Sequence, residues 1–211
     1  MHYPMKLPLS ENEPFGLVVF VHASASGRFA PRNKFIADTF NRNGLATVFL
    51  DLMTLEEERL DNVSMQLRFD MNVLTERIIT SLMIIHRIES VPYIKDLKIG
   101  LMSTSTAGGA CMIAASKLQD LVSTVALRGG RPDLATTYLK NVECPSIFVV
   151  GQNDQQFIDL NEKATRQMIT CPHKVLTTIP GAGHLFDERG KLEEVSEILQ
   201  EWFIRYLKKQ E

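Results

Sequence analysis

Three residue types that together activate a hydroxyl group occur along the chain in the order Ser105, Asp154, His184. A serine becomes a nucleophile near neutral pH when a histidine removes its proton, and the histidine needs a carboxylate that orients its ring. Each of the three comes shortly after a stretch that the sequence predicts to be a strand. Because the carboxyl ends of parallel strands meet at one edge of a sheet, we expect these side chains to meet there and to support acyl transfer through Ser105.

The segment around Ser105 has the pattern of a sharp strand-to-helix turn. Residues 99–115 start as an apolar strand, turn through small hydroxyl residues and continue as a helix of mostly small residues. Such a turn, usually written G-x-S-x-G, lifts a serine hydroxyl clear of the sheet. Ser103 and Ala107 occupy the glycine positions, and both are small. The same composition also suits simple close packing of a helix on a sheet, and we interpret Ser103 as a turn residue rather than a second nucleophile.

The oxyanion that forms during acyl transfer needs two converging N–H donors. The first would be the backbone N–H of Thr106, which directly follows the nucleophile and begins a helix whose first N–H groups have no internal partner. The second would be the backbone of Ser24, in the loop 22–27 after the first predicted strand.

Each candidate residue also has a structural interpretation. Asp154 could cap the helix that begins near Gln156. His184 could lie in a surface loop, and His22 is more typical of a packed structural histidine. Three arginines could either hold a substrate carboxylate bidentately or brace loops: Arg28, Arg32 and Arg128.

Short apolar runs alternate with segments of helical periodicity from residue 15 to the end of the chain. The apolar runs predict strands over 15–21, 46–50, 97–101, 121–127, 145–150 and 175–179. The predicted helices are 31–43, 69–88, 108–118, 133–140, 157–169 and 192–207. This alternation is typical of an α/β fold with a largely parallel sheet, and no linker or repeat divides residues 1–211, so we expect one domain. Residues 1–12 are interpreted as an edge strand or an arm, and the charged segment 51–68 as a surface loop or a reduced lid.

The composition argues against several classes of function. The formal net charge is −2 without a basic block, which disfavours a nucleic-acid partner. We predict neither a signal peptide nor a membrane span. The widely separated Cys111, Cys144 and Cys171 favour reduced thiols in a cytoplasmic protein over a disulfide or a metal site, and we place Cys111 in the core. Without G-x-G-x-x-G or a Walker lysine we expect no cofactor. The expected partner is a small ester-type molecule, and the oligomeric state stays open.

Five motifs spread over nearly the whole chain carry a resemblance to a known family. They are VFVHASASGRFAPRN at 19–33, Ser105-Thr106, RGGRPD at 128–133, VVGQND at 149–154 and PGAGHLF at 180–186. In these motifs the chain resembles the dienelactone-hydrolase-like branch of the α/β-hydrolases. The resemblance implies an α/β-hydrolase fold with a mostly parallel central sheet, helices on both faces and no large cap domain. It also implies a Ser105–His184–Asp154 catalytic triad.

We therefore expect a serine hydrolase, of esterase or dienelactone-hydrolase type, that cleaves a small ester, lactone or thioester through an acyl-enzyme. Two alternatives stay open. One is a catalytically weak or inactive α/β-hydrolase scaffold with a binding role; the other is an acyl transferase or amidase that uses the same triad. The chain departs from the family pattern at Ala23, Ser103 and Ala107, where glycine is common, and methyl groups there could narrow the oxyanion pocket.

Overall fold

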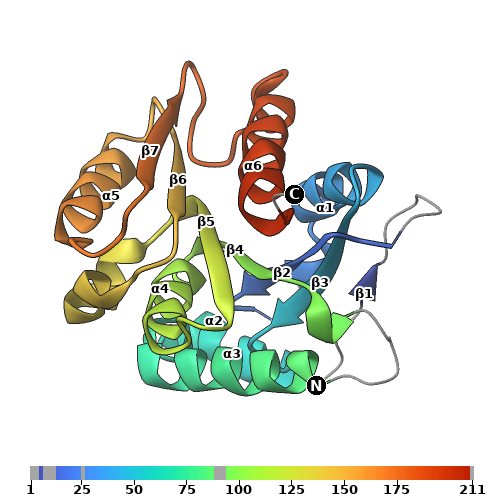
Figure 1. Cartoon of the computed structure of the whole chain (residues 1–211). Helices are drawn as coiled ribbons and strands as arrows, with labels where there is room; N and C mark the ends of the chain where they lie inside the picture. The colour runs from blue at the N-terminus through green and yellow to red at the C-terminus, as the bar shows by residue number, and fades with distance from the viewer. Residues whose placement is uncertain (1–4, 7–12, 25–26, 88–93, 210–211) are drawn as a thin grey trace.

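A seven-stranded sheet with the strand order β1-β3-β2-β4-β5-β6-β7 forms the centre of the molecule (Figure 1). The computed structural model describes residues 5–6, 13–24, 27–87 and 94–209; residues 25–26 of the loop 22–27, and Ile88 at the predicted end of a helix, lie outside these ranges. The strands are β1 Met5–Lys6, β2 Gly16–His22, β3 Leu45–Asp51, β4 Ile99–Ser105, β5 Val122–Gly130, β6 Ser146–Gly151 and β7 Lys174–Ile179. Strands β2 to β7 are parallel and β1 is antiparallel, which confirms the predicted sheet.

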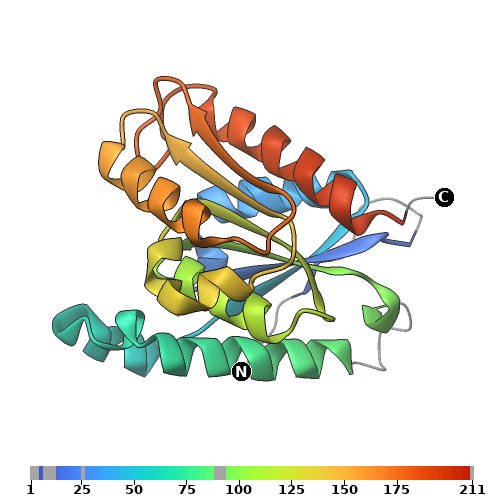
Figure 2. The ribbon, with the colours of Figure 1, turned by 60° about the vertical axis from the view of Figure 1, so that its left-hand side comes forward.

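Helices cover both faces of this sheet. They are α1 Pro31–Arg42, α2 Leu55–Ser64, α3 Met71–His86, α4 Ala107–Lys117, α5 Gln155–Gln167 and α6 Lys191–Leu207. Short 3₁₀ helices are η1 Gly27–Phe29, η2 Leu67–Phe69, η3 Ile94–Asp96 and η4 Pro132–Asn141. Figure 2 shows α1 and α6 on one face and α3 and α4 on the other.

The alternation of side chains along β2 explains why both faces are covered. Successive strand residues point to opposite faces of a sheet. Leu17, Val19 and Val21 pack into the cluster under α3 and α4, whereas Val18 and Phe20 pack into the cluster under α1 and α6. All seven residues of β2 are buried, as expected for a continuous apolar run. Within the described ranges, no helix is both long and apolar enough to span a membrane.

The N-terminal segment matches one of its two sequence interpretations, whereas the segment 51–68 differs from the loop interpretation. Strand β1 pairs with β3, so residues 5–6 form an edge strand, one of the two alternatives for the N-terminal segment; residues 1–4 and 7–12 of that segment lie outside the described residues. The segment 51–68, however, is not a loop, because most of it is helix α2. Thr54 and Glu57 form a capping box at the start of α2, and the carboxylate of Glu57 binds Arg77 of α3 at 2.6 Å. This hydrogen-bonded pairing lowers the pKa of Glu57 to about 2.

Strands β4 and β5 run further toward the carboxyl edge than the sequence predicts. The prediction ended β4 at residue 101, before its hydroxyl residues, but pairing with β5 continues to Ser105, which lies opposite Gly130. The predicted helix 133–140 is a run of 3₁₀ turns broken at Thr136, whose φ is +45°. These extensions carry Arg128 and Ser105 to the same edge.

The three cysteines are free thiols in protected positions. Cys111 lies in the core of α4, as predicted, and Cys171 is also buried, while Cys144 is half-buried. Burial raises the pKa of Cys111 and of Cys144 to about 12, and it raises the pKa of Cys171 as well. These thiols are therefore protonated at neutral pH.

Helix α6 anchors one face of the sheet through Phe203. Its side chain is fully buried, and its ring meets that of Phe40 edge-on at 5.5 Å. A Cβ atom at Gly100 of β4 would come within 2.6 Å of the Phe203 ring, so the ring lies directly on the backbone of the strand that ends at Ser105.

We predict that Phe203→Ala lowers the free energy of unfolding by about 3–5 kcal/mol, because it removes a large buried side chain and leaves a cavity. Urea denaturation followed by circular dichroism measures the change. Glu201→Ala, at an exposed position of the same helix, is the control and should change stability by less than about 0.5 kcal/mol. A loss below about 1 kcal/mol for Phe203→Ala would contradict this account of the core.

Candidate active site

Ser105 lies at a strained turn between β4 and α4. It is the last residue of β4, it is exposed, and its φ is +51°, in the left-handed region that non-glycine residues rarely adopt. Its carbonyl oxygen accepts a hydrogen bond from the backbone N–H of Arg131 at 2.9 Å, which holds the turn against the end of β5. Non-glycine residues held in this region are concentrated at functional sites.

Small residues allow the strand and the helix to approach one another at this turn. A Cβ atom at Gly108 would lie 3.4 Å from Cα of Gly130, the last residue of β5, and Ala107 is completely buried. Ser103 points away from the turn, because its buried hydroxyl donates a hydrogen bond to the carbonyl of Val21 at 2.9 Å. Ser103 thus lies within β4 rather than in the turn, where the sequence interpretation placed it, and its buried hydrogen bond favours a structural role over that of a second nucleophile.

The side chains of Asp154 and His184 are hydrogen-bonded to each other at the same edge of the sheet. His184 Nδ1 lies 2.6 Å from Asp154 Oδ2, and the side chains are 40% and 14% exposed. Asp154 occupies the N-cap position of α5, yet its side chain makes no capping hydrogen bond. The carboxylate therefore serves the histidine rather than the helix.

The loops that carry this pair are tied together, and the His184 ring is bounded on two sides. The backbone N–H of Asn153 donates to the carbonyl of Ala182 at 2.9 Å. The ring of Phe157 packs on that of His184 with centroids 4.3 Å apart. On the other side a Cβ atom at Gly129 would lie 3.3 Å from His184 Cε1, so the glycine leaves room for the ring.

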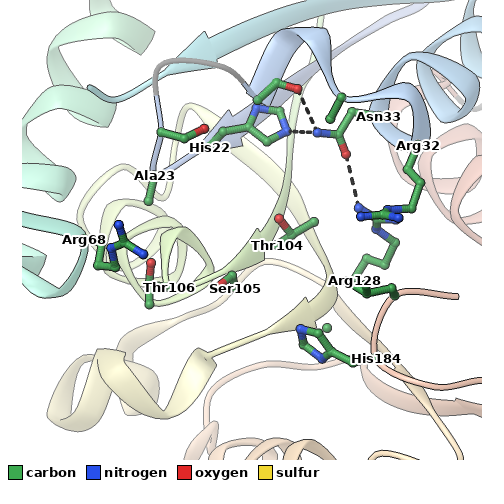
Figure 3. Close-up of a pocket in the computed structure, with 15 residues that line it drawn as sticks. His22, Ala23, Arg32, Asn33, Arg68, Thr104, Ser105, Thr106, Arg128 and His184 are labelled. Carbon is green, nitrogen blue, oxygen red and sulfur yellow. Dashed lines mark hydrogen bonds between the residues drawn. The ribbon is translucent and has the colours of Figure 1, made fainter. Parts of the chain in front are cut away.

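Ser105 and His184 open into one cavity of about 450 Å³ (Figure 3). Ser24 and Thr106, the two residues expected to supply backbone N–H donors, also line it. Asp154 does not line the cavity and supports His184 from behind. Among the described residues, no group of three or more His, Cys, Asp or Glu side chains is arranged to hold a metal ion.

The three arginines named from the sequence separate into two groups. Arg32 and Arg128 line the cavity, whereas Arg28 does not. The Arg28 guanidinium binds the carboxylate of Asp51 at 2.6 Å, and its backbone N–H donates to the same side chain at 3.2 Å. For Arg28 the structure thus matches the loop-bracing alternative.

A buried polar network forms the wall of the cavity next to Arg128 (Figure 3). The amide nitrogen of Asn33 lies 2.7 Å from His22 Nε2 and donates to the carbonyl of Gly27 at 2.9 Å, while Arg128 Nη2 donates to Asn33 Oδ1 at 3.2 Å. Because the Asn33 amide nitrogen is a donor, His22 Nε2 must accept, and the ring carries its proton on Nδ1. Burial and the neighbouring Arg128 lower the pKa of His22 to about 4, so this histidine is neutral and structural.

Asn33 and Arg68 line the cavity but were given no role from the sequence. Asn33 lies on the buried stripe of α1 with Ile36 and Ala37, as does Asn41, and amides on such a stripe are a signal that sequence reading can detect. Arg68 of η2 also lines the cavity. Its Nε donates a hydrogen bond at 2.5 Å to the carboxylate of Asp61, a buried residue of α2. Nothing in the spacing of the charged segment 51–68 distinguishes this arginine from its neighbours.

A family model and solved structures are similar to this chain over nearly its whole length. The model of the Dienelactone hydrolase family matches residues 9–207. The chain belongs to this family. A dienelactone hydrolase from Anabaena variabilis is 38% identical and has a TM-score of 0.87, with 98% of this chain and 92% of that chain covered. Est1E from Butyrivibrio proteoclasticus shares the fold at 16% identity, with a TM-score of 0.74 over 97% of this chain and 93% of its own.

Two curated proteins from Mycobacterium tuberculosis strains are also similar. Each is named "Putative phosphoribosyl transferase" and is 39% identical over 196 residues, which cover 92% of this chain but 42% of the relative. The chain therefore spans less than half the length of these relatives. As an α/β hydrolase by family and fold, it has the architecture that the sequence predicts.

The buried His22 makes stability depend on pH. Its pKa is about 4 in the folded protein against an ordinary value of 6.5, so between these values the unfolded chain binds a proton that the folded protein does not. The free energy of unfolding should fall as the pH is lowered through this window, by at most about 1.4 kcal/mol per pH unit. The charged groups that face His22 are Arg128 and Asp51, and Arg28 pairs with Asp51. The raised pKa of Asp51 makes stability change with pH in the opposite direction.

Urea denaturation between pH 7 and pH 5 measures this dependence. We predict that His22→Gln, whose side chain is neutral at every pH, reduces the slope of the free energy of unfolding against pH. The reduction should approach the slope that corresponds to one bound proton. His86→Gln, at an exposed histidine of α3, is the matched control and should leave the slope unchanged. Equal slopes for wild type and His22→Gln would contradict the neutral assignment of His22.

Proposed function

We propose that the protein is a serine hydrolase that cleaves a small ester, lactone or thioester, with Ser105 as nucleophile, His184 as base and Asp154 as the carboxylate that orients the histidine. The observation that carries the proposal is the 2.6 Å contact of His184 Nδ1 with Asp154 beside an exposed serine whose φ is +51°. With Nδ1 bound to the carboxylate, Nε2 is the nitrogen left to accept a proton.

The proposed reaction has two balanced steps. In the first, Ser105 Oγ attacks the carbonyl carbon and its proton passes to His184 Nε2; the bond from that carbon to the leaving oxygen or sulfur breaks, and the leaving group takes the proton. In the second, water gives a proton to His184 and attacks the acyl carbon; the bond to Ser105 breaks, and Ser105 regains the proton. Asp154 stabilises the imidazolium that forms in each step.

Thr106 and Ser24 are the proposed sources of the oxyanion hole. Thr106 directly precedes the first residue of α4, where backbone N–H groups lack internal partners. Ser24 lies in the loop after β2 and lines the same cavity. Two N–H groups from these segments would stabilise the negative charge on the tetrahedral intermediate.

Ser105 and His184 line one cavity but are not hydrogen-bonded to each other in this structure. Catalytic hydrogen bonds in free enzymes are often long and tighten when substrate binds, so this separation is compatible with the proposed roles. The exposure of His184 favours hydrolysis over transfer to a second substrate, because water can reach the histidine that would activate it.

The inactive-scaffold alternative rests on the three departures from glycine. Two of them lie in the turn region, and the turn forms with both present: Ser103 is hydrogen-bonded in the sheet and Ala107 is buried in α4. Ala23 lines the cavity, where its methyl group could slow acylation.

Asp154→Asn tests the role of the carboxylate. We expect turnover of a p-nitrophenyl ester to fall about 10³–10⁴-fold, because the amide favours the wrong histidine tautomer while the fold is kept. Asp159→Asn, at an exposed aspartate of the same helix, is the control and should keep normal turnover. Near-normal activity of Asp154→Asn would move the orienting role to another residue.

An organophosphonate probe tests whether Ser105 is activated. Its adduct mimics the tetrahedral intermediate, so only a serine beside a base and an oxyanion hole reacts readily. We predict one adduct, located at Ser105 by peptide mass mapping. Ser105→Ala and His184→Ala should abolish it, and Ser103→Ala should keep it.

Two results of the labelling experiment would oppose the proposal. Failure of the folded wild type to react with probes of several sizes would favour the binding scaffold. An adduct on Ser103 would keep serine chemistry but assign it to the wrong residue.

A further inference from the structure

Arg128 is a buried cation without a carboxylate partner. Strand β5 carries it to the cavity, where it is 8% exposed. Burial and the nearby Arg32 lower its pKa to about 10, which still leaves it charged at neutral pH. Within the part of the chain that the structure describes, no carboxylate lies at ion-pair distance from its guanidinium. A buried charge of this kind is unfavourable unless something compensates it.

Other arginines of the same protein show what a bracing role looks like. Arg28, Arg77 and Arg131 each bind a carboxylate at 2.6 to 2.7 Å, and none of them lines the cavity. Arg68 does line the cavity, but its guanidinium is held by buried Asp61. Arg128 has a neutral partner instead, the side-chain oxygen of Asn33. The buried network therefore orients its guanidinium, and among the described carboxylates the more distant Asp187 offsets only part of its charge.

Arg32 adds a second cation to the same wall of the cavity. Its guanidinium is 38% exposed and binds Asp187 at 2.7 Å. The side chain of Asp187 is 58% exposed, and such a surface pair is weak. Arg32 and Arg128 repel each other strongly enough to shift the pKa of Arg128. An anion between the two guanidinium groups would remove this repulsion and could replace Asp187 on Arg32.

We propose that Arg128 and Arg32 form an anion subsite of this cavity, and that it binds a phosphate group of the substrate. This inference rests on the proposed function for the cleavage step, but binding of the anion does not depend on it. A phosphate monoester carries a charge of about −1.5 to −2 at pH 7 and has three acceptor oxygens, which suits two guanidinium groups better than a single carboxylate charge.

The position of the subsite limits the size of the substrate. Arg128 lies opposite Thr104 in the pairing of β4 with β5, one residue before Ser105. The phosphate would therefore bind close to the carbonyl group that Ser105 attacks. The substrate class is a small phosphorylated ester or thioester, in which few bonds separate the phosphate from the cleaved acyl bond.

Binding of inorganic phosphate tests the subsite directly. Isothermal titration is carried out on wild type and on Ser105→Ala at constant ionic strength, because salt screens charges near a surface. We expect the two proteins to bind phosphate equally. Arg128→Gln and Arg32→Gln should each weaken binding at least 10-fold, because charge-assisted, bidentate contacts are lost.

Two further variants make the test specific. Asp187→Asn should bind phosphate several-fold more tightly than wild type, because it removes the carboxylate that competes for Arg32. Arg166→Gln deletes an exposed cation on α5 that pairs with Glu162 and does not line the cavity, so it should not change binding. Since Arg32 is exposed, its variant should fold even if Arg128→Gln does not.

Three outcomes would overturn the proposal. They are no phosphate binding up to tens of millimolar, an equal loss in Arg166→Gln, and acetate binding as tightly as phosphate, which would assign the subsite to a carboxylate. Phosphate binding that responds to Arg128, Arg32 and Asp187 supports the subsite even if the phosphonate probe fails to label Ser105. In that case only the catalytic proposal fails.

Discussion

The left-handed backbone at Ser105 is the constraint on which the rest of the site depends. It costs roughly 1–3 kcal/mol and persists only because the surroundings determine it. The carbonyl of Ser105 is bound by the N–H of Arg131, and α4 leaves the turn with its first nine residues buried. Glycines allow that helix to pack against the end of β5. The hydroxyl is therefore exposed at the sheet edge because a large apolar interface, rather than a local preference, holds the turn.

Two polar side chains of the cavity, His184 and Arg128, are oriented by hydrogen bonds of different kinds, one to a charged partner and one to a neutral partner. A charged support holds His184, whose Nδ1 meets the carboxylate of Asp154. A neutral support holds Arg128, through Asn33 and a histidine that burial keeps unprotonated. The first support suits a group that gains a proton during a reaction, and the second leaves a positive charge available to a ligand.

The apolar runs were sufficient to predict the parallel sheet. A strand that is buried on both faces must consist almost entirely of apolar residues, and such runs are visible in the sequence. The order Ser105, Asp154, His184 predicted that these residues share an edge, since topology brings strand ends together. Helix α2 escaped prediction because its face lacks an apolar stripe and its position depends on the contact of Glu57 with Arg77. Which arginine reaches the cavity could not be read from spacing either. Arg28 and Arg32 lie four residues apart and each binds a carboxylate, but Arg28 is held on Asp51 away from the cavity, whereas Arg32 binds Asp187 and lines it.

The protected thiols give the protein a property useful for spectroscopy. Alkylating reagents react with thiolates, and burial keeps Cys111, Cys144 and Cys171 protonated. We therefore expect the three native cysteines to react slowly with alkylating reagents in the folded protein. A cysteine introduced in place of Leu185, which is 48% exposed on the cavity rim, would carry a fluorophore or spin label at one defined place. The emission of the fluorophore or the line shape of the spin label would then report ligand binding in the cavity, and the native cysteines would stay unchanged.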